Sequence, residues 1–325
     1  CYTSMITMQS WMFLSSFENL RKNIIEKTEI KTLNHLGARA FSEIGGEVVS
    51  TVAWISQKKS PNNDGIYLRL VDYNNAELKE EEFFNKNNYF QAKQKDFEKI
   101  PGSPIAYWVS DKIREIFEKN QKLGEIADLK NGFTTGNNDL FLRLWNEVSF
   151  IKIGYNMKNS QEALESKKKW FPYNKGGNFK KWYGNQEYLI NWENEGNSIK
   201  GYGHLVARSL KYMFLPNISW SKIGSSTISF RYYPLGFMFD VAGLSMFLQK
   251  EISYFYIIGF LNSKISHRIL AFLSSTLNFE VGHISNIPII KKENTLVEKL
   301  VEENLNISKE EWDSRETSWD FEKIS

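Results

Sequence analysis

Basic and amide side chains alternate with aromatic rings between residues 171 and 183, a pattern suited to contacting a phosphate backbone. The adjacent glycines Gly176 and Gly177 would let backbone amides approach a phosphate closely, because they carry no Cβ atom. The alternative is a β-hairpin with a solvated turn whose aromatic residues fill a core. The side chains that we expect to contact a nucleic acid here are Lys175, Lys180, Lys181, Trp182 and Tyr183.

A second candidate segment, residues 219–233, has a hydroxyl-rich loop followed by an arginine. A guanidinium group can donate two parallel hydrogen bonds to a guanine edge or to a phosphate, so Arg231 is the strongest single candidate for reading a base. Ser221 and Lys222 belong to the same candidate set. The alternative for Arg231 is a salt bridge to a carboxylate such as Asp240.

The net charge of +3 hides an uneven distribution along the 325 residues. Residues 167–231 carry eleven Lys and Arg against three Asp and Glu, whereas residues 293–325 carry four against ten. A basic middle segment suits a polyphosphate partner, although a folded domain can also carry such charge for solubility alone. The charge pattern therefore favours nucleic acid as a partner without requiring it.

The cysteine and histidine content argues against a disulfide framework and against a metal site. The single cysteine is Cys1, and four histidines are scattered without a ligand spacing, so we expect no metal and a reducing cytoplasm. The apolar run 254–261 is too short to span a bilayer, so we expect no membrane association. Because the chain opens without Met or a basic leader, we interpret it as a fragment.

The first 73 residues have the pattern of an α/β sheet edge. Strands are predicted at residues 2–8, 30–36, 48–55 and 66–72, with Gly45-Gly46 joining the middle two. Residues 15–26 have a helical apolar stripe, made by Phe17, Leu20, Ile24 and Ile25.

The rest of the chain divides at a polar segment. Residues 74–104 are rich in Asn, Lys and Glu and end in two prolines, which predicts a linker. A helix is predicted at 111–119, followed by short β-like runs with a long helix at 252–273. The acidic end predicts a helix from residue 295 to 307 and beyond, with the apolar stripe Leu296, Val297, Leu300, Val301 and Leu305.

Several of these segments together resemble the adenine-specific DNA methyltransferases of the BREX phage-defence type and their type IIG restriction-modification relatives. Residues 2–16 resemble the strand and loop after the catalytic strand, and residues 33–51 resemble the last segments of the sheet. The resemblance to the family's recognition region rests on residues 131–138, 171–177, 181–184, 229–233 and 276–279. It covers nearly the whole chain.

Two motifs of that family are absent from this chain. The family binds S-adenosylmethionine on a Gly-containing loop and performs its chemistry with an Asn-Pro-Pro-Tyr type motif, and the sequence contains neither. Methylation of an adenine amine needs a hydrogen-bond acceptor and an aromatic ring that stacks the extruded base, and the family supplies both from that motif. We therefore assign no catalytic residue and expect this chain alone to be inactive and not to bind the cofactor.

The resemblance implies a fold and a set of domains. Residues 1–73 would be the C-terminal part of a Rossmann-like methyltransferase sheet, 74–104 a linker, 105–292 a mixed α/β target-recognition domain and 293–325 a helical segment. The intact protein would methylate adenine N6 in a specific site of double-stranded DNA, with S-adenosylmethionine as methyl donor, and could assemble with other defence proteins. This chain would mainly supply the recognition of the DNA sequence.

The resemblance also implies further site residues. Ser10, Trp11 and Phe41 would line the pocket for the flipped base, although an ordinary packed role for Trp11 is the alternative. Thr134, Thr135 and Asn137 would lie near DNA on the Gly-rich turn 132–138, which lacks the spacing of a nucleotide-binding loop. A tight turn selected for positive φ is the alternative for this segment.

Two other functions remain open at this point. A non-catalytic specificity subunit would use the same recognition fold but would have no reason to carry a methyltransferase strand in its first 73 residues. A protein-binding module, or a decoy for phage proteins that mimic DNA, is compatible with the charge pattern. Competition between duplex DNA and an acidic protein would separate these uses.

Overall fold

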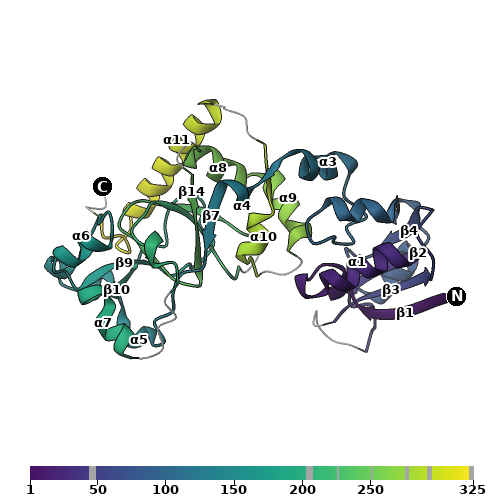
Figure 1. Cartoon of the computed structure of the whole chain (residues 1–325), viewed down its shortest axis with the longest axis horizontal. Coiled ribbons are helices and arrows are strands. Elements are labelled where there is room, and N and C mark those ends of the chain that lie inside the picture. The colour runs from purple at the N-terminus through teal and green to yellow at the C-terminus, as the bar shows by residue number, and fades with distance from the viewer. Residues whose placement is uncertain are drawn as a thin grey trace. The chain divides into compact units, whose positions relative to one another are not determined.

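The computed structural model of this chain describes residues 1–43, 49–202, 208–224, 227–249, 252–274, 278–290 and 295–321. It divides into two compact units. Unit 1 comprises residues 1–121 with 271–275, and unit 2 comprises residues 122–270 with 276–325. Both units contain helices and sheets (Figure 1), which confirms the predicted mixed α/β class.

Unit 1 is built on one five-stranded sheet with the strand order β1-β3-β2-β4-β5. β1, β2 and β4 run in the same direction, whereas β3 and β5 run antiparallel to their neighbours. All four predicted strands are confirmed, and Gly45-Gly46 lies outside the described residues. The strands are β1 (Tyr2–Met8), β2 (Glu29–Ala38), β3 (Ser50–Gln57), β4 (Gly65–Arg69) and β5 (Tyr89–Ala92).

One face of this sheet packs against helix α1 (Glu18–Lys27) and the turns around it. Ile24 and Ile25 are buried as predicted, but Phe17 and Leu20 are 37% and 46% exposed. Arg21 is buried in place of Leu20, because its guanidinium donates hydrogen bonds to three backbone carbonyls. The core contains Trp11, Met12, Ile24, Ile25, Ile30, Leu33, Val52, Trp54, Tyr67, Ala92, Phe97, Ile105 and Tyr107.

The opposite face of the sheet exposes several apolar side chains among polar ones. The strand register places Ile6, Ile55 and Ile66 on this face, where they are 63%, 41% and 42% exposed. Tyr2 lies on the same face of β1 and is 64% exposed. This face is therefore exposed at β1, β3 and the start of β4, whereas Leu68 on the same face is buried.

Residues 74–104 do not form the predicted linker. α2 (Ala76–Glu82) begins at Asn75, whose side chain accepts a hydrogen bond from a helix amide, and β5 pairs with β4. Gln94 is buried because its side chain bonds both the Ile30 amide and carbonyls at the end of α1. The boundary between the units follows residue 121 instead of 104, after the predicted helix α3 (Asp111–Lys119).

Unit 2 contains two four-stranded sheets, with the strand orders β13-β9-β10-β8 and β12-β11-β14-β7. Only β13 and β9 form a parallel pair within these two sheets, as far as the described residues show. The strands are β7 (Ala127–Lys130), β8 (Leu142–Leu144), β9 (Trp170–Asn174), β10 (Tyr188–Asn191), β11 (Asn217–Ser221), β12 (Phe230–Tyr233), β13 (Met238–Phe239) and β14 (Gly243–Leu248). The short strands β6 (Gln121–Lys122) and β15 (Pro288–Ile289) lie outside these two sheets and pair with each other.

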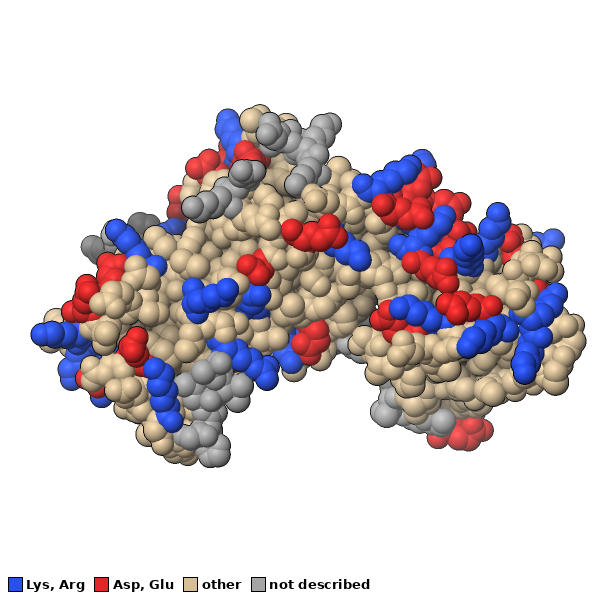
Figure 2. Space-filling model, in the orientation of Figure 1, with Lys and Arg blue, Asp and Glu red and all other residues tan. Residues whose placement is uncertain are grey.

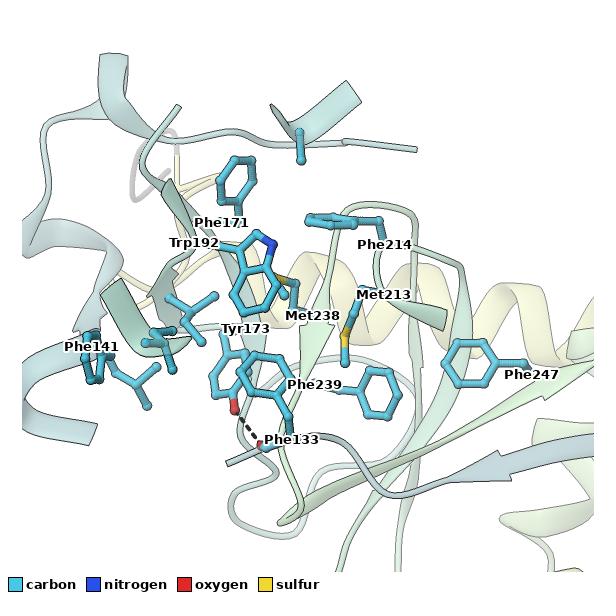
Figure 3. Packing of buried hydrophobic residues seen from close by; sticks show 14 residues of the cluster. Phe133, Phe141, Phe171, Tyr173, Trp192, Met213, Phe214, Met238, Phe239 and Phe247 are labelled. Atoms are coloured by element: carbon cyan, nitrogen blue, oxygen red, sulfur yellow. Dashed lines mark hydrogen bonds between the residues drawn. The ribbon is translucent and has the colours of Figure 1, made fainter. Parts of the chain in front are cut away.

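The core of unit 2 is made largely of aromatic rings (Figure 3). The ring of Phe133 packs against two others. Its centroid lies 5.6 Å from that of Tyr173 and 5.3 Å from that of Trp192. The Tyr173 hydroxyl donates a hydrogen bond to the Phe133 carbonyl at 3.2 Å, drawn as the dashed line in Figure 3. This core fixes the strand ends from which the candidate loops project.

The predicted helix 252–273 is two helices, α8 (Tyr254–Leu261) and α9 (Lys264–Leu273). The break occurs at Asn262, whose side-chain amide exchanges two hydrogen bonds with the backbone of Phe230 on β12. The other helices of unit 2 are α4 (Leu123–Ile126), α5 (Asn138–Phe141), α6 (Ser160–Glu165), α7 (Glu193–Gly201), α10 (Val281–Ser285) and α11 (Thr295–Asp313).

Helix α11 confirms the predicted terminal helix and packs on α8, so the acidic segment is part of unit 2. Val301 and Leu305 are buried as predicted, whereas Leu296 and Leu300 are 62% and 48% exposed. Within the described part of the chain, no helix has the length and apolarity needed to cross a bilayer.

Candidate nucleic-acid interface

The loop after β9 and the strands β11 and β12 lie together, as expected for a shared surface. The Ser221 hydroxyl donates to the Gly177 carbonyl at 2.7 Å, and the Trp182 amide donates to the Phe230 carbonyl at 3.0 Å. Gly176 approaches the Ala242 carbonyl so closely that a Cβ atom would lie 2.7 Å from it. The two candidate segments are therefore connected by backbone contacts, and Gly176 is required for the close approach.

Arg231 is fully buried, which does not favour its predicted role in reading a base. Its guanidinium donates hydrogen bonds to the hydroxyls of Ser221 and Ser229, at 3.1 Å and 3.4 Å, and to the Lys180 carbonyl at 3.4 Å. The alternative of a salt bridge to Asp240 is not found either among the described contacts. Arg231 instead holds the loop after β9 against β11 and β12.

Asp240 makes hydrogen bonds with partners other than Arg231, and no pattern in the sequence predicts these partners. Its carboxylate accepts hydrogen bonds from the Tyr173 hydroxyl and the Ala242 amide, both at 2.8 Å, and lies 3.9 Å from the Lys175 ammonium. Burial, followed by the charge of Asp240, raises the pKa of Tyr173 well above its ordinary value. Asn174, also fully buried, donates to Ser219 at 2.6 Å.

Lys175 and Lys222 are two candidate lysines whose side chains are partly exposed. Their side chains are 27% and 33% exposed. Each has one carboxylate nearby: Asp240 lies 3.9 Å from the Lys175 ammonium, and Glu280 lies 3.0 Å from the Lys222 ammonium. Because such partly exposed pairs contribute little to stability, both ammonium groups can turn to another anion at small cost.

Lys180 and Lys181 are engaged with other parts of unit 2. The Lys180 ammonium lies 3.1 Å from Glu311 and 5.9 Å from the centre of the Trp312 ring, both on α11. The Lys181 ammonium donates to the Asn262 carbonyl at 3.3 Å. These contacts connect the loop to α11 and α8, and the Lys180 side chain is 29% exposed, close to the 27% of Lys175.

Trp182 and Tyr183 are half-buried, which agrees with the hairpin alternative more closely than with rings presented to bases. Trp182 has a positive φ of 71° and exchanges backbone hydrogen bonds with β12. Burial, followed by the charges of Asp313 and Asp320, raises the pKa of Tyr183. Its ring lies 5.5 Å from the Lys309 ammonium on α11.

The Gly-rich segment 132–138 forms a tight turn that leads into α5. A Cβ atom on Gly132 would lie 2.0 Å from the Phe239 carbonyl, so only glycine fits there. Thr135 is 2% exposed and its hydroxyl donates a hydrogen bond to Asn138, which does not favour the predicted contact with DNA. Asn137 accepts a hydrogen bond from a helix amide as the N-cap of α5, and Thr134 is half-buried at the surface.

The residues expected near a flipped base lie in two segments of unit 1, around the turn after β1 and after the end of β2. Trp11 is 6% exposed, packs 5.3 Å from the Trp54 ring and donates to Thr7, so the alternative of a packed core residue is confirmed. Ser10 lies in the same turn and is half-buried. Phe41 is 39% exposed and lies just before undescribed residues.

The carboxyl ends of β1, β2 and β4, where α/β sheets commonly bind ligands, hold packed side chains. His35 bonds Gln9 at 2.7 Å and Tyr107 at 3.2 Å, and the Arg69 guanidinium lies 4.7 Å from the centre of the Trp108 ring. Burial lowers the pKa of His35 to about 3.

The visible face of unit 2 carries basic and acidic side chains side by side, without a single continuous basic surface (Figure 2). The described residues contain no group of three or more His, Cys, Asp or Glu that could hold a metal ion. The arrangement can therefore offer separate lysines, hydroxyls and backbone amides to a ligand.

No protein-family model matches the chain. Over 98% of its length it is 43% identical to the adenine-specific methyltransferase PglX of Lacticaseibacillus casei (strain Zhang), and over 99% it is 40% identical to the adenine-specific methyltransferase BrxX of Escherichia coli O9:H4 (strain HS). It covers 28% and 26% of these relatives, so the chain spans about a quarter of their length. The predicted resemblance to methyltransferases of this type is confirmed for the aligned segment.

The fold also has a counterpart among solved structures. The type IIL restriction-modification enzyme MmeI, solved in complex with DNA, matches 98% of this chain with a TM-score of 0.54 and 10% sequence identity. The match covers 43% of that enzyme. At this identity the similarity shows a shared fold.

Proposed function

We propose that this chain is the DNA-recognising part of a site-specific adenine-N6 methyltransferase that acts in the cytoplasm in phage defence. The observation that carries the proposal is the 40–43% identity to two adenine-specific methyltransferases over nearly the whole chain. Unit 2 would recognise duplex DNA, and the sheet of unit 1 would be the end of the methyltransferase sheet. The intact protein would use S-adenosylmethionine and could assemble with other defence proteins.

The structure of unit 2 supports the proposal that this unit contacts DNA. Lys175 and Lys222 project from the loops that buried Arg231 holds together, so two cations stand on a fixed framework. Thr134 and Asn137 lie on another turn of the same unit. A free-standing specificity subunit would have no use for the five-stranded sheet of unit 1, which favours the methyltransferase assignment.

The experiment is to measure duplex binding by the 325-residue chain with fluorescence anisotropy across salt concentrations, and to select preferred sites from a pool of random duplexes. We expect enrichment of one sequence and a steep decrease in affinity with salt, because phosphate contacts release counterions. Absence of duplex binding, or an affinity independent of salt, would contradict the proposal.

The matched variants are the double change Lys175→Gln and Lys222→Gln, and Lys158→Gln as a control in the same unit. Removing one lysine that binds a phosphate should reduce the slope of log affinity against log salt by about one. We therefore expect the double variant to weaken all duplexes and to reduce the slope by about two, whereas Lys158→Gln should change neither. An equal effect of the control would mean that only the general charge matters.

A further inference from the structure

Three cations of unit 2 take no part in the DNA contacts proposed above. They are Lys200, at the end of helix α7, and Arg208 and Lys211 in the segment that follows it. They belong to a stretch, residues 196–239, that contains five Lys and Arg and no Asp or Glu. All three residues are exposed, and we call them the α7 cations. Such a stretch concentrates positive charge that a polyanion can use.

The α7 cations differ from the candidate lysines in their surroundings. Within the part of the chain that the structure describes, no carboxylate lies at ion-pair distance from any of the three. By contrast, Lys175, Lys180 and Lys222 each lie within 3.9 Å of a carboxylate. An anion that binds the α7 cations therefore displaces no ion-pair partner.

Two of the α7 cations line the same hollow. Lys200 and Lys211 border a space of about 220 Å³ together with Trp192 and Glu195. The Lys200 ammonium lies 5.7 Å from the centre of the Trp192 ring, and the Lys211 ammonium lies 4.9 Å from that of the Tyr212 ring. The rings attract and restrain the two side chains. Two ammonium groups beside the single carboxylate of Glu195 leave the hollow with a positive charge.

The segment after α7 is fixed to the Gly-rich turn. The Ser209 hydroxyl donates to the Asn131 carbonyl at 2.9 Å, and the Asn137 amide donates to the Tyr202 hydroxyl at 3.3 Å. Figure 1 shows the two helices involved, α5 and α7, next to each other. Ser209 has a φ of 57°, a conformation that costs a residue other than glycine about 1–3 kcal/mol and persists only where its surroundings hold it. The α7 cations are therefore held beside this turn.

The same turn also reaches the loop that carries Lys175. The Phe133 amide donates to the Phe239 carbonyl at 3.3 Å, and Phe133 forms an isolated β-bridge with Asp240. Asp240 is the carboxylate that lies 3.9 Å from the Lys175 ammonium. The Gly-rich turn thus contacts the segment of the α7 cations as well as the surroundings of Lys175. Both sets of cations belong to one continuous part of unit 2.

We infer that the α7 cations bind phosphates of the same duplex that Lys175 and Lys222 contact, so that the duplex lies across the Gly-rich turn. The inference rests on the proposed function and adds a second set of backbone contacts to it. Phosphate contacts fix the register and orientation of a protein on a duplex. Two such sets on either side of the turn would hold base edges near Thr134 and Asn137.

The experiment compares two triple variants of the 325-residue chain by fluorescence anisotropy with duplex DNA across salt concentrations. The first combines Lys200→Gln, Arg208→Gln and Lys211→Gln. The matched control removes three exposed lysines of the same unit, by Lys152→Gln, Lys158→Gln and Lys167→Gln. We expect the first variant to weaken all duplexes similarly and to reduce the slope of log affinity against log salt by about three, because each lost phosphate contact releases fewer counterions. An unchanged slope in the first variant, or an equal reduction in the control, would overturn the inference.

The parent chain separates a failure of this inference from a failure of the proposed function. If the parent does not bind duplex DNA, the proposed function fails and the inference fails with it. If the parent binds and the first triple variant keeps the parent's slope, only the contact by the α7 cations is excluded.

A second measurement locates the contact without relying on affinity. Arg208→Cys, in a Cys1→Ser background that removes the single native cysteine, carries an iron–EDTA reagent that cuts nearby DNA. Lys158→Cys in the same background carries the reagent in the control. We expect the first protein to cut a bound duplex at a few adjacent nucleotides and the control to cut at no preferred position. A variant that still binds but gives no local cleavage from position 208 would overturn the inference.

Discussion

Arg231 connects three parts of unit 2 through hydrogen bonds to Ser221, Ser229 and the Lys180 carbonyl. No carboxylate pairs with it among the described residues, so neutral oxygens of the loops solvate the guanidinium. Such an arrangement is specific in geometry, because the group can donate only in fixed directions. Its function is to fix the loop that carries the candidate lysines.

Arg231→Ala is therefore expected to destabilise unit 2 instead of relaxing preference at one base. The change leaves buried acceptors without a donor and opens a cavity, which together cost about 2–5 kcal/mol. Urea unfolding gives the free energy of unfolding, and Lys181→Ala, which removes a half-buried side chain from the same loop, is the milder comparison. A stable Arg231→Ala protein with altered preference at one position would contradict this assignment.

His35 makes the stability of unit 1 depend on pH. Burial, followed by the charges of Arg69 and Lys79, lowers its pKa to about 3, whereas an unfolded histidine titrates near about 6.5. Below that value the unfolded chain binds a proton that the folded chain does not bind, so stability falls as the pH falls towards 3. The loss is about 1.4 kcal/mol per pH unit within this window.

The variant His35→Gln cannot take up this proton. We expect it to be less stable than the parent chain at pH 8, because it loses part of the bonding to Gln9 and Tyr107. Between about pH 6.5 and 5 the difference in the free energy of unfolding should shrink, since only the parent loses stability through this group. Urea unfolding at pH 8, 6 and 5 measures it, and a constant difference would show that His35 does not titrate in this way.

At the scale of elements, the contact of α8 with α11 depends on Gly259. A Cβ atom at this position would lie 2.7 Å from Cγ2 of Val301, a buried branched side chain that cannot rotate away freely. Gly259→Ala should therefore destabilise unit 2 by about 1–3 kcal/mol, as overpacking does. The additional change Val301→Ala should recover part of this loss by removing the clash.

The matched control for this helix contact is Gly282→Ala in α10. A Cβ atom there would have no heavy atom within 4 Å, so the change should be neutral or stabilise by up to about 1 kcal/mol through helix propensity. Thermal unfolding of the three variants measures the comparison. Equal effects at Gly259 and Gly282 would mean that helix propensity, and not packing, decides both.

The elements also show which features the sequence could predict. Local patterns identify the four strands of unit 1 and the helix α3, because alternation and capping residues act within a few neighbours. The segment 74–104 has the polar composition of a linker, so its sequence predicts no packed structure. It is nevertheless ordered by a few long-range contacts, such as the hydrogen bonds of Gln94 with α1. The break at Asn262 has the same origin, since its partner Phe230 is 32 residues away.

The candidate site is harder to predict than the fold. Sequence patterns single out two segments that lie together in the fold, but residue type alone does not separate an exposed lysine from a buried arginine. Arg231 and Thr135 have the hydrogen-bonding capacity that contact with DNA requires, and both use that capacity inside unit 2. Burial depends on the packing of distant strands, which a single sequence does not reveal.

At the scale of the whole molecule, the uncovered face of the unit 1 sheet is the feature that the described chain leaves without a partner. Ile6, Ile55 and Ile66 form an apolar surface between 41% and 63% exposed, and β1 is an edge strand. Exposed apolar side chains gathered on one face favour association, and an open edge strand adds a second route to it. We expect the 325-residue chain to self-associate through this face as its concentration rises.

Sedimentation velocity over a range of concentrations measures the self-association. The double variant Ile55→Glu with Ile66→Glu should remain monomeric where the parent chain does not, because like charges on the face repel each other and oppose burial. Leu296→Glu, which places a charge at a 62% exposed position on α11, is the control and should associate like the parent. A parent chain that stays monomeric at every concentration, or a control that abolishes association equally, would show that the open face of unit 1 does not drive contact between copies.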